Sequence, residues 1–181
     1  MKAVTVIASP RRNGNCKRIV DYIAEGIEEN GGSNEIFFVD DMNIKGCQAC
    51  KACKNMEKPT KCIINDDFRV IMDKVEKSDA FIFAVPNYFG EINAQGHLFM
   101  DRFYSMTKTT PNQLTNYPKC IFVHTYGASA GHYDEYINKR AKVFSSIGCN
   151  LIEVLSVGEN KPTSGDCDEL IEHARSLGRK L

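Results

Sequence analysis

Four of the eight cysteines lie within sixteen residues, and this cluster is the strongest chemical signal in the chain. Three of them, Cys47, Cys50 and Cys53, recur at every third position. The fourth, Cys62, follows after eight further residues. Thiolates are soft ligands that suit iron–sulfur clusters and zinc. Because short turns bearing Cys at every third position can reach three irons of one cubane, the spacing of the first three indicates a metal site. Cys62 is the candidate for a fourth ligand from a more distant position in the loop.

Other interpretations of the cysteine cluster remain open. The thiols could bind a structural zinc, although no histidine lies close to them in the sequence. They could also form a redox-active dithiol, or bind nothing. We expect Cys120 and Cys149, at the starts of apolar runs, to be buried as small hydrophobic residues. Five lysines near the cluster could moderate its negative charge: Lys45, Lys51, Lys54, Lys58 and Lys61.

A second group of chemically suggestive residues follows the first apolar run. If a parallel strand ends there and a helix begins, the helix N-terminus offers free N–H groups and a partial positive charge to an anion. Gly14 would let the backbone approach a phosphate, and Arg11 or Arg12 would offset its charge. The segment is neither a Walker A motif nor a dinucleotide fingerprint, and an ordinary turn capped by Ser or Asn fits it equally well. The candidate phosphate ligands are Ser9, Arg11, Asn13, Gly14, Asn15 and Cys16.

The elements that must position these residues alternate along the chain. Five apolar runs rich in Val, Ile and Phe are typical of strands buried on both faces. Amphipathic segments with helical spacing separate and follow them, and glycines end several of these segments. This alternation predicts a parallel sheet covered by helices on both sides. The predicted strands are 3–8, 35–39, 80–85, 120–124 and 151–157, and the third helix is expected at about 94–104.

One connection is much longer than the others. Residues 40–65 show little periodicity and contain the cysteine cluster, and loops of this length are usually functional. The 181 residues, 43% hydrophobic and 25% charged, predict a single folded domain over 1–181. Zero net charge argues against a nucleic-acid partner. Because no signal peptide or membrane-spanning stretch is evident, we expect a cytoplasmic protein without a membrane partner.

Three loops of the sequence resemble those of the NADPH-dependent FMN reductase family of flavodoxin-like proteins. They are Ser-Pro-Arg-Arg-Asn-Gly-Asn at 9–15, Pro-Asn-Tyr-Phe-Gly at 86–90 and Thr-Tyr-Gly at 125–127. Asp101-Arg102, at the end of the third predicted helix, fits the same pattern, whereas Cys16 replaces the Thr or Ser common in the family. Core packing is the alternative role for Tyr88 and Phe89. The resemblance implies that the flavin is bordered by Pro86, Asn87, Tyr88, Phe89, Gly90, Thr125, Tyr126 and Gly127.

The cysteine cluster extends the resemblance to the iron–sulfur flavoproteins of the same group, which carry a four-cysteine motif after the second strand. The resemblance implies a flavodoxin-like, doubly wound sheet of five parallel strands in the order 2-1-3-4-5. It also implies FMN and a 4Fe-4S cluster as cofactors of an electron-transfer oxidoreductase. The expected partners are a redox protein such as ferredoxin, or NAD(P)H, and further copies of the chain in a homodimer or homotetramer.

Two other functions remain alternatives. The protein could be a cluster-free NAD(P)H-dependent FMN or quinone reductase, or a zinc-stabilised binding module without turnover. We find no nucleophile elbow and no catalytic triad, so no side chain is assigned a catalytic role and the chemistry falls to cofactors. His124 ends the fourth predicted strand, and we interpret it as a structural histidine with satisfied hydrogen bonds.

Overall fold

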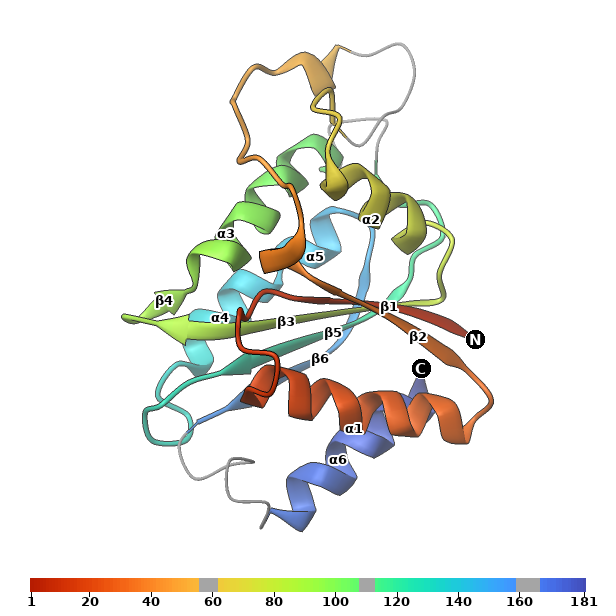
Figure 1. The fold of residues 1–181 in the computed structure, drawn as a ribbon, viewed down its shortest axis with the longest axis vertical. Coiled ribbons are helices and arrows are strands. Elements are labelled where there is room, and N and C mark those ends of the chain that lie inside the picture. The colour runs from red at the N-terminus through yellow and green to blue at the C-terminus, as the bar shows by residue number, and fades with distance from the viewer. Residues whose placement is uncertain (56–61, 108–112, 159–166) are drawn as a thin grey trace.

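The computed structural model describes residues 1–55, 62–107, 113–158 and 167–181. At its centre, five parallel strands lie in the order β2-β1-β3-β5-β6, and the short β4 pairs antiparallel with the end of β3 (Figure 1). The predicted order 2-1-3-4-5 is confirmed, because the fourth and fifth predicted strands are β5 and β6. β4 is an addition that the sequence did not indicate. The strands are β1 (Lys2–Ile7), β2 (Ser33–Phe38), β3 (Ala80–Tyr88), β4 (Glu91–Ile92), β5 (Lys119–Thr125) and β6 (Asn150–Val157).

Helices cover both faces of the sheet, with α1 and α6 on one face and α2 to α5 on the other (Figure 1). The third predicted helix ends at Asp101 and continues as a 3-10 turn over Arg102–Met106. None of the described helices is long and apolar enough to cross a membrane. The helices are α1 (Asn15–Glu29), α2 (Asp67–Val75), α3 (Ala94–Asp101), α4 (Asp134–Ala141), α5 (Val143–Ser146) and α6 (Asp168–Lys180).

An aromatic cluster fixes α3 and the following 3-10 turn against the sheet. The rings of Phe83 in β3 and Phe99 in α3 stack with their centroids 5.6 Å apart. Phe68 of α2 lies 5.0 Å from Phe99, and Phe103 meets Phe99 edge-on at 5.6 Å. All four rings are fully buried. Phe99 lies three residues before Arg102 and Phe103 directly follows it, so this packing fixes the backbone of Arg102.

On the opposite face, α1 and α6 touch through glycines. A Cβ on Gly26 would lie 2.0 Å from the carbonyl oxygen of Arg175, and a Cβ on Gly178 would lie 2.0 Å from that of Ile23. No larger residue fits at either position unless the backbone moves. This close packing fixes the axis of α1, and with it the direction in which the N-terminus of α1 points.

Candidate functional site

The three predicted loops meet at one edge of the sheet, because each follows the carboxyl end of a parallel strand. Two buried contacts join them. The Nδ2 of Asn93 donates to the carbonyl oxygen of Ala8 at 2.7 Å, which links the first loop to the start of α3. The sulfur of Cys16 lies 3.2 Å from Oγ1 of Thr125, which links the first loop to the third. Sequence reasoning missed Asn93, although an Asn directly before a helix is a typical N-cap.

The N-terminus of α1 is open to an anion. Its N-cap is Gly14, which has no side chain that could cap the helix. The N–H groups of Asn15 and Lys17 in the first turn therefore have no intrahelical or capping partner within the described residues. The loop itself is compact, because Gly14 N–H donates to the carbonyl oxygen of Arg11 at 3.2 Å. The alternative of a turn capped by Ser or Asn lacks the capping hydrogen bond that it requires.

The two arginines of this loop differ in what they contact. The Arg12 guanidinium is hydrogen-bonded to Asp41 and lies 4.1 Å from the ring centroid of Phe38. The hydrogen bond with Asp41 raises the pKa of Arg12. Arg11 is exposed and has no acidic partner among the described residues. Of the two candidate cations, Arg11 is the one whose charge remains available to a phosphate.

Three predicted ligands use their side chains inside the protein. Cys16 is 1% exposed, and burial raises the pKa of its thiol to about 12, so it is a neutral partner for Thr125. The hydroxyl of Tyr126 accepts from the N–H of Gly131 at 2.9 Å, and its ring packs so closely on Gly158 that a Cβ there would lie 2.6 Å from it. These residues join and shape the loops, and only their backbone groups remain for a ligand.

The second loop is a tight hairpin between β3 and β4. Phe89 and Gly90 have φ values of 54° and 84°, the left-handed pair expected for a type I′ turn. The Asn87 Oδ1 accepts from the N–H of Gly90 at 3.1 Å. Tyr88 is 41% exposed and Phe89 is fully exposed. The alternative that these two aromatics pack in the core is therefore wrong.

His124 departs from its predicted role. The residue is completely buried at the end of β5, yet neither ring nitrogen has a hydrogen-bond partner in the described parts of the chain. The rings of Tyr126, Tyr133 and Tyr136 surround it at 5.2 to 6.5 Å. Burial lowers the pKa of His124 to about 4. It is a neutral histidine in an aromatic cage, and the prediction of satisfied hydrogen bonds is wrong.

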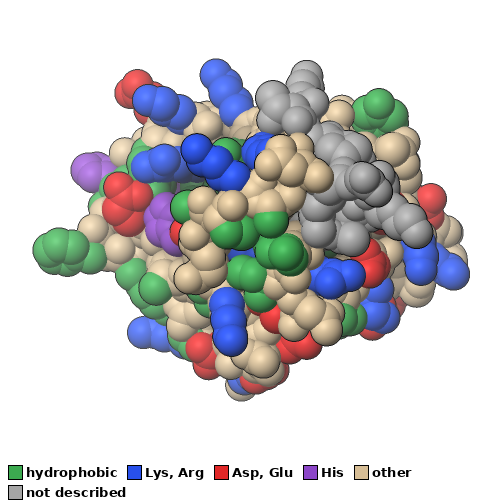
Figure 2. All heavy atoms as spheres, turned by 90° about the horizontal axis from the view of Figure 1, so that it is seen from above, with side chains coloured by type: hydrophobic (Ala, Val, Ile, Leu, Met, Phe, Trp, Pro, Cys, Tyr) green, Lys and Arg blue, Asp and Glu red, His purple; other side chains and the backbone are tan. Residues whose placement is uncertain are grey.

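The four cysteines lie in the cysteine segment, whose described residues are 45–55 and 62–64. This segment lies at the end of the molecule seen in Figure 2, where lysine and arginine side chains are visible around it. Cys47, Cys50, Cys53 and Cys62 all line one narrow hollow. Cys53 and Cys62 are buried, whereas Cys47 and Cys50 are exposed. Among the described residues, no three His, Cys, Asp or Glu side chains are close enough together to hold a metal ion. The structure thus gathers the four thiols without completing a coordination site.

The backbone beside Cys50 is strained. Its two neighbours, Ala49 and Lys51, have φ values of 49° and 57°, in the left-handed region that non-glycine residues rarely adopt. Burial raises the pKa of the Cys53 thiol, Lys54 lowers it, and the three other thiols of the cluster raise it further. Lys58 and Lys61 lie outside the described residues.

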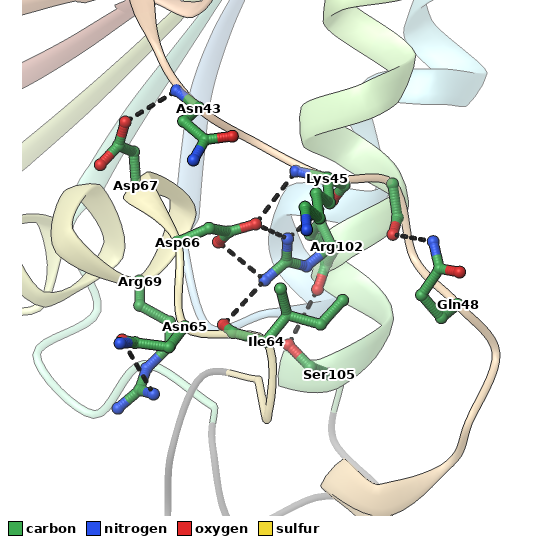
Figure 3. Close-up of polar contacts among 11 residues, drawn as sticks. Asn43, Lys45, Gln48, Ile64, Asn65, Asp66, Asp67, Arg69, Arg102 and Ser105 are labelled. Carbon is green, nitrogen blue, oxygen red and sulfur yellow. Dashed lines mark hydrogen bonds and ion pairs between the residues drawn. The ribbon is translucent and has the colours of Figure 1, made fainter.

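A buried ion pair anchors the segment that carries these cysteines (Figure 3). Arg102 and Asp66 form two hydrogen bonds, at 2.6 and 3.1 Å, and their side chains are 0% and 3% exposed. Arg102 also donates to the carbonyl oxygens of Lys45 and Ile64, at 2.7 and 3.4 Å. Sequence reasoning noted Arg102 only as the end of a helix. Its position between two buried phenylalanines was the available signal for a buried charge.

The strand order and the loops at the carboxyl edge define a flavodoxin-like α/β protein. The fold is similar to an NAD(P)H:quinone oxidoreductase from Methanothermobacter marburgensis, with a TM-score of 0.73, 17% identity and coverage of 100% of this chain and 98% of that one. Flavodoxin 1 from Bacillus cereus is also similar, with a TM-score of 0.64, 19% identity and coverage of 98% and 95%. At these identities the likeness shows the fold alone.

The chain belongs to the NADPH-dependent FMN reductase family, whose model matches residues 1–161. It is 31% identical over 195 residues to an iron-sulfur flavoprotein of Methanocaldococcus jannaschii, covering 100% of this chain and 95% of the relative. An iron-sulfur flavoprotein of Archaeoglobus fulgidus is 27% identical over 181 residues, covering 100% and 79%. The protein is therefore an FMN-dependent oxidoreductase, as the three loops had predicted.

Proposed function

We propose that this oxidoreductase passes electrons between a 4Fe-4S cluster and FMN. The observation that carries the proposal is the gathering of Cys47, Cys50, Cys53 and Cys62 around one hollow. Four cysteine thiolates are the usual ligand set of such a cluster, and the names of the two curated relatives support the same function. Helix α3 connects the two sites and is only about 12 Å long at 1.5 Å per residue.

The residues at the loop edge fit FMN. The open first turn of α1, with Ser9, Asn13 and Arg11, would hold the phosphate. The ring would lie between the second and third loops, where Nδ2 of Asn87 is a buried donor without a partner among the described residues. A Cβ at Gly127 would meet nothing within 4 Å, so a ligand has room there. When bound, FMN supplies the redox chemistry, and the chain orients it.

The cysteine segment fits a cluster by its donor set and by its charge. Four thiols face one hollow, and the cations Arg102 and Lys51 line the same hollow. They would offset the negative charge of four bound thiolates. We further propose that a ferredoxin-type protein or NAD(P)H supplies the electrons, and that the chain acts as a homodimer or homotetramer in the cytoplasm.

A second candidate function is a cluster-free NAD(P)H-dependent reductase of flavins or quinones. One observation favours it: the described cysteines do not form a completed metal site. In this case the nicotinamide would deliver hydride directly to the flavin, and the thiols would serve no redox purpose.

Anaerobic purification followed by assays of iron, acid-labile sulfide, zinc and flavin separates these functions. We expect FMN and about four irons per chain. Cys53→Ser should lose iron and keep FMN, whereas Cys167→Ser, a matched change in a partly buried cysteine outside the cluster, should keep both. FMN without iron, combined with rapid NADPH oxidation, would support the cluster-free reductase instead. Zinc without flavin would contradict both functions.

The two arginines of the phosphate loop provide a test of the flavin site. Arg11→Gln should weaken FMN binding by about tenfold, because it removes a charge-assisted contact to the phosphate. Arg12→Gln should have a much smaller effect, since that guanidinium is already bound to Asp41. Fluorescence titration of the apoprotein with FMN measures both. Equal losses in the two variants would contradict the assignment of Arg11.

A further inference from the structure

Arg102 is buried in a way that is unusual for a charged side chain. Only 1% of its surface is exposed, and it is the only charged residue in the buried class among the described residues. It follows α3 directly and lies over the ring of Phe68, with its guanidinium carbon 4.7 Å from the ring centroid. A buried charge is costly unless its partners are well placed. The hydrogen-bond partners of Arg102 therefore indicate its structural role.

Those partners lie on both sides of the cysteine segment (Figure 3). On the side that enters the segment, Nη1 donates to the carbonyl oxygen of Lys45, two residues before Cys47. On the side that leaves it, Nη2 donates to the carbonyl oxygen of Ile64, two residues after Cys62. The carboxylate of Asp66 accepts from both nitrogens and also accepts from the backbone N–H of Lys45 at 3.0 Å. One guanidinium thus fastens the two ends of the segment together.

One N–H donor of Arg102, at Nε, is not used by these contacts. Nη1 and Nη2 make two hydrogen bonds each, which accounts for four of the five N–H groups of a guanidinium. The fifth, at Nε, is buried and has no hydrogen-bond partner in the described parts of the chain. Arg102 lines the same hollow as the four cysteines. Burial alone would lower the pKa of Arg102, but its neighbours Asp66 and Cys62 raise it.

We propose that Arg102 is the positioning residue of the cysteine site: it clamps the ends of the segment and presents its Nε–H and its charge to the hollow that the four cysteines line. This inference rests on the proposed 4Fe-4S function. A positive charge and an N–H donor beside a ligating sulfur stabilise the reduced, more negative state of a cluster. Arg102 therefore favours assembly of the site and raises its reduction potential.

The test compares Arg102→Lys and Arg102→Gln with the wild type and with Arg69→Gln. Arg69 is a matched control, since it lies in the same region and, among the described residues, its guanidinium donates only to Oδ1 of Asn65, at 3.4 Å. After anaerobic reconstitution we expect iron to fall from about four per chain to below about one in Arg102→Gln. Arg102→Lys keeps the charge but not the forked geometry, so it should retain part of its iron. FMN content near one per chain in each variant reports that the fold is intact.

The midpoint potential of the retained cluster is measured by redox titration followed by electron paramagnetic resonance. It distinguishes an effect of Arg102 on the reduction potential from a purely structural role. We expect a more negative potential in Arg102→Lys and no change in Arg69→Gln. Wild-type iron content and an unchanged potential in both Arg102 variants would overturn the inference.

A third measurement does not depend on iron. In the metal-free protein, alkylation of the buried Cys53 and Cys62, followed by peptide mass spectrometry, reports opening of the segment. Arg102→Gln should speed it by about tenfold or more, as expected when a buried ion pair is broken. If the wild type binds no iron, the proposed function fails. Unchanged alkylation in Arg102→Gln would then show that the clamp fails as well.

Discussion

The carboxyl edge of the sheet, where the three flavin loops meet, is held differently from the cysteine segment. We call the first region the flavin edge. The flavin edge continues the sheet, and neutral buried contacts such as Asn93 to Ala8 tie its loops together. Within its described residues, the cysteine segment has one short 3-10 turn at Ala52–Lys54 and a strained backbone at Ala49 and Lys51. A buried ion pair lies at its base. The fold thus pre-organises the first region, whereas the second is held by charged side chains: the buried pair of Arg102 and Asp66, and Lys54, whose Nζ donates to Tyr104 and Thr107. Variants that separate these two modes of support test the comparison directly.

The largest effect is expected from Asp66→Asn. This change leaves Arg102 buried without its anion, and breaking a buried pair from one side costs about 3–5 kcal/mol. Guanidinium denaturation should show this loss in the free energy of unfolding, while FMN binding of the folded protein stays near that of the wild type. Glu35→Gln removes the partner of Lys74 in an exposed pair and should change stability little. If Asp66→Asn lowers the free energy of unfolding as little as the control does, the ion pair of Arg102 and Asp66 does not stabilise the protein.

His124 makes the flavin edge sensitive to acid. Its pKa is about 4 in the folded protein against 6.5 when exposed, so the folded state favours the neutral ring. The stabilisation is complete above pH 6.5, and about 3 kcal/mol of it is lost as the pH falls to 4. His124→Phe should remove this part of the pH dependence in denaturation curves measured between pH 4 and 7. The same slope in the variant and the wild type would contradict the depressed pKa.

A smaller effect is expected at the joint between the flavin loops. Asn93→Ala removes the bond to Ala8 and the cap of α3, which together contribute about 2 kcal/mol. FMN binding should also weaken in Asn93→Ala, because the first loop would lose its link to the start of α3. Asn116→Ala is the control, because Asn116 bridges the carbonyl oxygens of Val75 and Ser78 at the amino edge of the sheet. If both variants bind FMN equally well, the joint does not position the flavin loops.

The smallest effect concerns the exposed hairpin. Phe89→Asn should stabilise the protein by about 0.5 kcal/mol, because Asn tolerates a positive φ and Asn-Gly favours a type I′ turn. FMN binding should nevertheless weaken, since Phe89 is one of the residues expected to border the flavin and its ring would be lost. Thermal melts and FMN titration measure the two outcomes separately. An unchanged affinity would remove Phe89 from the flavin site.

The family resemblance supplied the expected strand order. The sequence by itself determined which segments are strands, the positions of most helices, the three loops at the carboxyl edge and the four clustered cysteines. These features are local, because periodicity and spacing along the chain encode them. Only the tertiary structure decided that Cys16 pairs with Thr125, 109 residues away, and that Arg102 fastens Lys45 across 57 residues. It also decided that His124 has no hydrogen-bond partner among the described residues. Such contacts depend on which side chains packing brings together, and no short stretch of sequence records that.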